Sequence, residues 1–152
     1  MSPGPCLQLD VGNSGAKWRL LAADGQVLSR GLYAPDDPAA RASLLECADA
    51  LSHIWIASVA SPSHNEELAA LLAGRWSIEP WFASSESRAG DLVNSYQDPR
   101  KMGVDRWLAM LAARQRCDQR LCVIDAGSAL TIDVVAADGR HEGGYILSLI
   151  HI

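Results

Sequence analysis

The chain has few cysteines, and they form no recognisable ligand or pairing pattern. They stand at Cys6, Cys47, Cys117 and Cys122, with no C-x-x-C pair and no cluster with histidine. This spacing argues against both a zinc site and a disulfide framework. Two of them, Cys6 and Cys122, lie within apolar runs, which predicts that they are small core residues.

Basic residues and long apolar runs are also scarce. Lys and Arg number 13 against 18 Asp and Glu, and the formal net charge is −5. General nucleic-acid-binding proteins usually carry a basic stripe, so we expect no nucleic-acid partner. No run reaches the roughly 18 apolar residues of a membrane-spanning helix, so we expect no membrane partner. The first residues lack the features of a signal peptide, and we expect a cytoplasmic protein.

Two short segments share one pattern that points to phosphate chemistry. The segments 10–17 and 125–133 each follow an apolar run and contain aspartate, a spacer, glycine and then an amide or hydroxyl residue. Glycine in a tight strand–turn–strand lets backbone N–H groups approach a phosphate, while the aspartate offers oxygen to a cation. Two such turns predict two half-sites on one polyphosphate, as in a nucleotide-dependent phosphotransferase. Each turn alone is also compatible with a purely structural role, because Asp and Gly populate ordinary turns.

Hydrophobic periodicity predicts an alternation of strands and helices. The expected strands are 7–10, 16–22, 26–33, 53–60, 76–82, 121–125, 130–136 and 143–147. The expected helices are 39–51, a helix that Ser61-Pro62-Ser63 caps and that runs to about Ala73, and 104–117. We place Ser63 and Glu66 in a capping box. The polar segment 83–102 is typical of a long functional loop.

The opening pattern of three strands restarts near residue 121. Leu9-Asp10-Val11-Gly12 is echoed by Ile124-Asp125-Ala126-Gly127, and the turn Asp24-Gly25 by Asp138-Gly139. Such a repeat predicts a duplicated architecture. We therefore divide the chain into a domain over 1–117 and the first three strands of a second copy over 118–152.

Four motifs, in this order, carry a resemblance to a known family. They are D-V-G-N-S at 10–14 with Lys17, G-V-D-R-W at 103–107, D-A-G-S-A-L-T-I-D at 125–133, and G-G-Y-I at 143–146. Together they resemble type III pantothenate kinases, in the superfamily of acetate and sugar kinases, Hsp70 and actin. The resemblance implies an α/β, ribonuclease-H-like (actin-like ATPase) fold with a mixed sheet, followed by an incomplete second copy of that fold.

The resemblance also implies an activity. The expected reaction is ATP-dependent phosphorylation of pantothenate to 4′-phosphopantothenate, the first step of coenzyme A biosynthesis. The implied cofactors are Mg²⁺ with ATP and a monovalent cation, K⁺ or NH₄⁺. The implied assembly is a homodimer at full length. A non-catalytic regulatory or transcription-activator relative is a second interpretation, and another small-molecule kinase of the superfamily is a third, against which G-V-D-R-W weighs.

Residue roles follow from the same resemblance. The implied general base is Asp105, and the implied ligand of the monovalent cation is Asp125. The expected ATP-binding residues are Asp10, Val11, Gly12, Asn13, Ser14, Gly15, Ala16, Lys17 and Ser128. The expected pantothenate-binding residues are Tyr96, Gly103, Val104, Asp105 and Arg106. Family members usually have threonine where this chain has Ser128, which keeps the hydroxyl.

Several of these residues also have structural interpretations. The carboxylate of Asp105 could simply stabilise a helix N-terminus. A surface carboxylate could pair with Arg106, while Tyr96 could anchor its loop and Lys17 could be a solvated strand residue. The pair Gly143-Gly144 indicates either a strand bulge or a close approach to substrate.

The end of the sequence departs from the family pattern. After G-G-Y-I-L, family members continue with proline-glycine and roughly a hundred further residues, enough to complete a domain. Here the sequence is Ser148-Leu149-Ile150-His151-Ile152. We expect a C-terminally truncated chain that lacks the adenosine-binding segment and is inactive alone.

Overall fold

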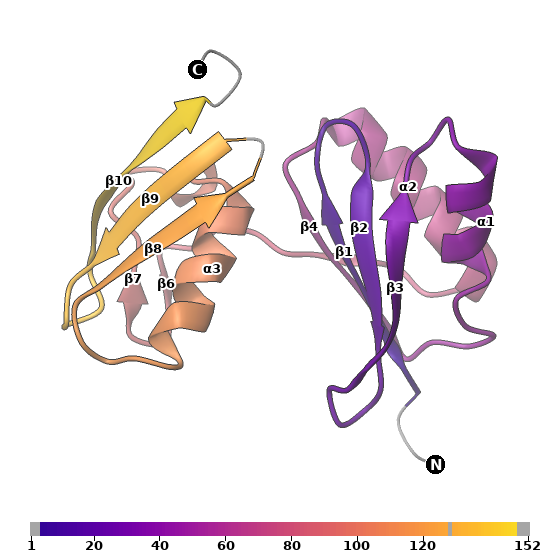
Figure 1. The fold of residues 1–152 in the computed structure, drawn as a ribbon, viewed down its shortest axis with the longest axis horizontal. Coiled ribbons are helices and arrows are strands. Elements are labelled where there is room, and N and C mark those ends of the chain that lie inside the picture. Colours follow the sequence, from indigo (N-terminus) through magenta and orange to yellow (C-terminus); the bar gives the residue numbers. More distant parts are fainter. Residues whose placement is uncertain (1–3, 128, 149–152) are drawn as a thin grey trace. The chain divides into compact units, whose positions relative to one another are not determined.

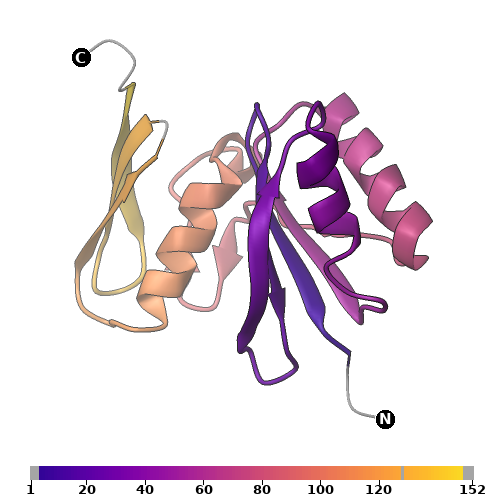
Figure 2. The same cartoon turned by 45° about the vertical axis from the view of Figure 1, so that its right-hand side comes forward.

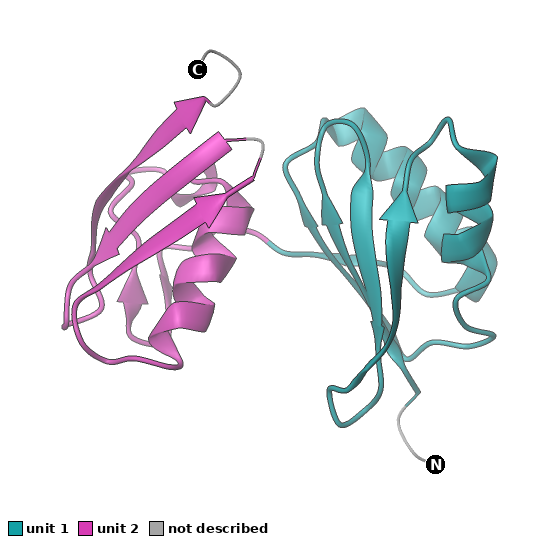
Figure 3. Ribbon diagram, viewed as in Figure 1, with its two compact units in different colours: residues 1–83 teal, residues 84–152 magenta. Residues whose placement is uncertain are grey.

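The computed structural model describes residues 4–127 and 129–148, in two compact units, 1–83 and 84–152 (Figure 3). The elements of the first unit are β1 (Cys6–Val11), β2 (Ala16–Leu21), β3 (Val27–Tyr33), α1 (Pro38–Leu45), β4 (His53–Ser58), α2 (Pro62–Trp76) and β5 (Trp81–Phe82). Those of the second are β6 (Arg88–Ala89), β7 (Leu92–Val93), the 3₁₀ helix η1 (Pro99–Lys101), α3 (Val104–Arg114), β8 (Leu121–Ala126), β9 (Ala129–Val135) and β10 (His141–Ser148).

The first unit is built on one mixed sheet with the strand order β3-β2-β1-β4-β5. Strand β1 runs antiparallel to β2 and parallel to β4. Both helices lie on the same face of this sheet (Figures 1 and 2). Their leucines join the apolar side chains of the strands in one core, which includes Leu7, Leu9, Val11, Leu44, Leu68 and Leu72. The predicted α/β fold with a mixed sheet is confirmed.

Side-chain alternation along β1 explains how this unit presents polar groups. Leu7, Leu9 and Val11 are buried toward the helices. Gln8 and Asp10 alternate with them and therefore point to the opposite face. On that face Asp10 lies in register with Lys17 of β2.

The helix boundaries of the first unit differ from the predicted ones. The N-cap of α2 is Ser61, whose hydroxyl accepts a hydrogen bond from the His64 N–H at 3.4 Å, so the capping box that begins at Ser63 is wrong. The helix also continues to Trp76, which removes the start of the predicted strand 76–82. Indole Nε1–H of Trp76 donates to the Ala48 carbonyl at 3.0 Å. That tertiary contact anchors the end of α2. Helix α1 is shorter than predicted, because it ends at residue 45 rather than 51, and Ala48 lies beyond its end.

In the second unit, α3 packs on one face of the three-stranded sheet β10-β9-β8 (Figure 2). The core between them contains Leu92, Met102, Trp107, Met110 and Val135. The segment predicted as a long loop, 83–102, contains the short strands β6 and β7 and the helix η1. It is therefore more ordered than its polar composition indicated.

The predicted recurrence of the opening three-strand pattern can be followed in the strand register of two meanders, β1-β2-β3 and β8-β9-β10. In the first unit Cys6 pairs with Leu21, and Leu21 with Val27. In the second, Leu121 pairs with Val135, and Val135 with His141. A register irregularity follows at the same place in each third strand, beside Val27 and beside His141. That this meander begins a second copy of the fold stays a prediction.

The boundary predicted at 117/118 marks the start of the sequence repeat. Packing divides the chain at 83/84 instead, so that α3 lies in the same compact unit as the second meander. The predicted division into two repeats at 117/118 is not the same as this division by packing, and it stays a prediction.

Among residues 4–127 and 129–148, no helix has both the length and the apolar character required to cross a bilayer.

Candidate functional site

The first glycine turn connects β1 to β2. Its backbone is closed by a hydrogen bond from the Gly12 N–H to the Gly15 carbonyl at 2.9 Å. Asn13 and Ser14 stand exposed at the tip. The backbone of Gly15 passes close to the backbone of Tyr33, and a Cβ placed on Gly15 would lie 2.6 Å from the Tyr33 carbonyl oxygen. The turn therefore needs glycine at that position.

Residues of this turn fall into two groups. Val11 and Ala16 are core residues, with 0% and 6% of their surface exposed. Only their backbone can face a ligand. Asp10 and Lys17 are exposed and directly opposite each other in the register of the two strands. A carboxylate and an ammonium group are thus available beside the turn, as a site for phosphate and a cation requires.

The second glycine turn, between β8 and β9, is related to the first but tighter. Asp125 pairs with Thr131 as Asp10 pairs with Lys17. The Gly127 N–H donates to the Ala129 carbonyl at 3.0 Å. The Asp125 residue is exposed. Ser128, predicted to contact ATP, lies outside the described residues.

The start of α3 carries the predicted general base. Gly103 is the N-cap and supplies no side-chain hydrogen bond, and Val104 is buried. Asp105 is exposed, and its Oδ1 accepts from the Arg106 N–H at 2.8 Å. The carboxylate therefore lies at the positive end of the helix, where the helix dipole favours a negative charge.

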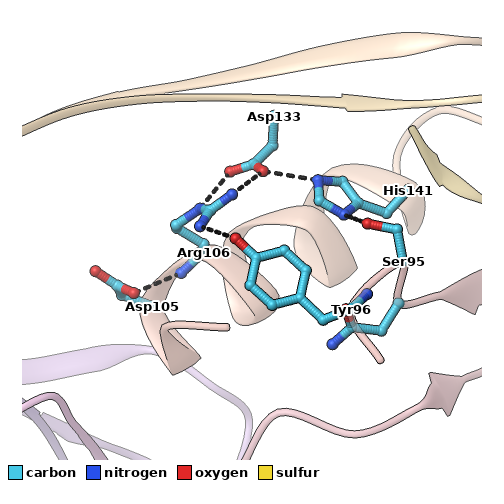
Figure 4. A network of polar contacts seen from close by, with 7 residues as sticks. Ser95, Tyr96, Asp105, Arg106, Asp133 and His141 are labelled. Atoms are coloured by element: carbon cyan, nitrogen blue, oxygen red, sulfur yellow. Dashed lines mark hydrogen bonds and ion pairs between the residues drawn. The ribbon is translucent and has the colours of Figure 1, made fainter. Parts of the chain in front are cut away.

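Arg106, by contrast, is buried. Its side chain is 4% exposed, and Nε and Nη2 donate to Asp133 at 2.9 and 2.5 Å (Figure 4). Nη1 donates to the Tyr96 hydroxyl at 3.1 Å, and the guanidinium lies over the Tyr96 ring. The structural interpretation of Arg106 as a partner of a surface carboxylate is therefore wrong: the partner is an interior one.

Asp133 is also bonded to a buried histidine. His141 Nε2 lies 2.8 Å from Asp133 Oδ1, and His141 Nδ1 lies 2.8 Å from the Ser95 hydroxyl (Figure 4). From the sequence, Asp133 was included only as part of the motif at 125–133, and neither His141 nor Ser95 was singled out. An available signal was the position of Asp133 between Ile132 and Val134, since an acid within an apolar strand requires a partner.

These contacts set the direction of two pKa shifts. Burial raises the pKa of Asp133, but the hydrogen bonds and charge of Arg106, joined by those of His141, outweigh it and hold that pKa below its usual value. Hydrogen bonding to Asp133 raises the pKa of Arg106, and burial opposes it. Both groups are therefore charged at neutral pH, as a buried ion pair.

The pair Gly143-Gly144 in β10 was predicted to be either a strand bulge or a close approach to substrate, and the two glycines differ in their surroundings. Gly143 lies at the register irregularity and has a φ of 123°, in the region that favours glycine. A Cβ on Gly144 would lie 2.8 Å from Nη2 of Arg106. The first glycine thus serves the bulge, and the second makes room for the ion pair.

Within the second unit, the structure brings together Tyr96, Gly103, Val104, Asp105 and Arg106. The turn residues 10–17 belong to the first unit, and their convergence with Asp125 on one ligand stays a prediction. Among the residues that the structure describes, no three His, Cys, Asp or Glu side chains form a group that could hold a metal ion. A cation at Asp125 would therefore need further oxygen atoms from backbone, water or substrate.

Comparison with known proteins gives the family. The family model for type III pantothenate kinase matches residues 6–152. The type III pantothenate kinase of Marinobacter nauticus is 40% identical over 141 residues, which cover 93% of this chain and 57% of that protein. That of Thiobacillus denitrificans is 42% identical over 139 residues, covering 91% of this chain and 55% of that protein. The chain thus spans little more than half the length of these relatives.

Solved structures give only distant likenesses. A Ppx/GppA phosphatase of Aquifex aeolicus aligns with a TM-score of 0.48 and 7% identity, covering 96% of this chain and 52% of that one. YeaZ from Pseudomonas aeruginosa aligns with a TM-score of 0.38 and 15% identity, covering 97% and 71%. Likenesses at this level do not bear on function. Because the family model matches residues 6–152, nearly the whole of this chain, the chain belongs to the type III pantothenate kinase family.

Proposed function

We propose that this chain is part of an enzyme that transfers the γ-phosphoryl group of ATP to the primary hydroxyl of pantothenate. The observation that carries the proposal is the exposed carboxylate of Asp105 at the N-terminus of α3, next in sequence to Arg106, whose guanidinium is bonded to Tyr96. In this proposal Asp105 is the base and its neighbours Arg106 and Tyr96 are the groups for an anionic substrate, and the membership of this family supports it.

Asp105 would act as the general base. In the reaction the hydroxyl oxygen of pantothenate forms a bond to the γ-phosphorus, and the bond from that phosphorus to the ADP oxygen breaks. The hydroxyl proton passes to the Asp105 carboxylate. Phosphoryl transfer depends mainly on positioning and electrostatic stabilisation, so the base is needed late in the transfer, when the hydroxyl has become acidic.

Tyr96 and Arg106 would bind the pantothenate carboxylate. Arginine has five N–H donors, and the two bonds to Asp133 and the one to Tyr96 leave further donors on Nη1 and Nη2. The Tyr96 oxygen accepts from Arg106, so its own hydrogen is free to donate. One charged and one polar donor therefore suit a carboxylate.

The two glycine turns would bind the phosphates of ATP. In this proposal Asp10 holds Mg²⁺ partly through water, Lys17 adds positive charge, and Asp125 binds K⁺ or NH₄⁺. Exposed carboxylates at both turns fit such hard cations, which prefer oxygen ligands. These ions would neutralise the charge on the transferred group. We also propose that the enzyme works in the cytoplasm as a homodimer, as the resemblance implies.

The test compares two proteins in a coupled assay of ATP turnover with pantothenate, Mg²⁺ and either K⁺ or NH₄⁺. The first is the 152-residue chain, which we expect to be inactive. The second is a chimera of residues 1–147 followed by the remaining C-terminal part of the Marinobacter nauticus relative. Pantothenate-dependent turnover by the folded chimera supports the proposal. A preference for a sugar or acetate, or ATP binding without turnover, contradicts it.

A further inference from the structure

Ser95 and Tyr96 are neighbours in sequence and are joined a second time through the interior. The path runs from the Ser95 hydroxyl to His141, on to Asp133, then to Arg106 and finally to the Tyr96 hydroxyl (Figure 4). With the peptide bond between Ser95 and Tyr96, these contacts close a ring. The ring ties the loop, α3, β9 and β10 to one another.

The chemistry of the groups sets the direction of each hydrogen bond. The Asp133 carboxylate only accepts, so the hydrogen of the imidazole lies on Nε2 of His141. When the imidazole is neutral, Nδ1 of His141 accepts from the Ser95 hydroxyl. At the other end of the ring, Arg106 donates to the Tyr96 oxygen. The hydrogens not used within the ring are that of the Tyr96 hydroxyl and one each on Nη1 and Nη2 of Arg106.

We propose that Ser95, His141 and Asp133 are positioning residues for the substrate carboxylate. They hold Arg106 and Tyr96 in one arrangement, with the Tyr96 O–H directed out of the ring toward the ligand. Three of the ring's members are almost inaccessible: the side chains of Arg106, Asp133 and His141 are 4%, 2% and 0% exposed. Asp133 and His141 are too buried for a substrate to reach, so they act through Arg106 and Tyr96, and Ser95 acts through its hydrogen bond to His141. This inference rests on the proposed function.

A second ion pair of α3 provides a matched control. Arg114 pairs with Asp91, which joins the same helix to the segment beside β7. Asp91→Asn therefore weakens another arginine–aspartate pair of α3 in the same unit, one whose carboxylate is exposed, without touching the ring. Ser87→Ala is the control for Ser95→Ala, because Ser87 is an exposed serine of the same polar segment.

The arrangement is tested first in the 152-residue chain by NMR, without any activity. Nitrogen shifts of the His141 ring should show hydrogen on Nε2 and none on Nδ1. The Nε–H of Arg106 should exchange slowly with solvent. His141→Leu should speed this exchange, and His141→Gln, which keeps a donor and an acceptor, should restore much of the protection. Asp91→Asn should leave it unchanged. Hydrogen on Nδ1, or equal effects of His141→Leu and Asp91→Asn, overturns the inference.

The functional consequence is tested in the chimera. His141→Leu and Ser95→Ala should raise the KM for pantothenate, by about tenfold for the loss of one oriented charge-assisted contact. The KM for ATP and kcat should change less than twofold, and His141→Gln should recover most of the loss. Equal rises in both KM values, or no difference from the controls Asp91→Asn and Ser87→Ala, overturns the inference. If the unmodified chimera fails to phosphorylate pantothenate while the NMR results hold, the failure is that of the proposed function.

Discussion

Gly144 lies directly against the ion pair of Asp133 and Arg106. The two strands place Gly144 opposite Asp133, and a Cβ on Gly144 would meet the Asp133 carboxylate itself. The same Cβ would lie 2.6 Å from the Ile132 carbonyl oxygen and 2.8 Å from Arg106 Nη2. Since the backbone carbonyl cannot swing aside as a flexible side chain can, even a methyl group at this position forces the strand or the ion pair to move.

We therefore expect Gly144→Ala to destabilise the second unit by about 1–3 kcal/mol, the usual range for overpacking. The measurement is urea unfolding followed by the indole NMR signal of Trp107, the one tryptophan of residues 84–152. Gly74→Ala is the matched control. Nothing lies within 4 Å of a Cβ at Gly74, which is helical, so this change should stabilise the first unit by about 0.5–1 kcal/mol. A neutral Gly144→Ala would show that the ion pair has room to shift.

Asp105→Asn should abolish most of the turnover of the chimera. If Asp105 is the base, kcat should fall by about 10²–10⁴-fold, the range for losing general base catalysis. The KM for ATP should change little, since Asp105 does not belong to a glycine turn. Steady-state kinetics at saturating ATP measure this effect. Unchanged turnover would mean that Asp105 only stabilises the start of α3.

Acid should destabilise the second unit through Asp133. A carboxyl group with a lower pKa in the folded state stabilises the fold above its unfolded pKa of about 3.9, and the contribution is lost as the pH falls through the folded pKa. Because the pKa of Asp133 is lowered, the unfolding free energy should be level near neutrality and fall below about pH 4. The Trp107 indole signal in urea at several pH values measures this.

The side-chain carbonyl carbon of Asp133 gives an independent check on the same point. Its chemical shift should titrate with a midpoint below that of an unfolded aspartate. A midpoint at or above about 4 would contradict the assigned cause. Asp91→Asn, which removes another carboxyl group with a lowered pKa, should leave the Asp133 midpoint in place.

The cap of α2 offers a direct comparison of two neighbouring serines. Ser61→Ala should destabilise the first unit by about 1 kcal/mol, because it removes the acceptor for the His64 N–H. Ser63→Ala should change stability by less than about 0.5 kcal/mol. Hydrogen exchange of the first amides of α2 measures both. A larger effect at Ser63 than at Ser61 would restore the capping box predicted from the sequence.

Features of the fold that neighbouring residues determine were predictable from the sequence, whereas features that depend on tertiary contacts were not. Alternation of apolar residues predicted β1, and a nearly continuous apolar run predicted β4; both patterns depend only on neighbouring residues. The glycine turns were predictable for the same reason. The end of α2 was not, because Trp76 is held in the helix by contacts with the core and with Ala48.

The interior ring was equally hidden from local patterns. Arg106 and Asp133 lie 27 residues apart in sequence, and the motif containing each appeared complete without the other. Sequence reasoning predicted Asp105, Arg106 and Tyr96 as a group through the family resemblance. The buried supports of that group depend on how α3 packs against β9, which no motif states.

The irregularity in β10 decides which ionisable side chain enters the interior. Were the pairing of β10 regular, strict alternation from Gly144 would send Glu142 inward and His141 outward. A second carboxylate would then face Asp133, and like charges would repel. The extra residue at the bulge instead leaves Glu142 outside, paired with Arg120 at 2.9 Å, and admits the imidazole. One extra residue in β10 thus places an imidazole, rather than a second carboxylate, next to Asp133 in the interior of this unit.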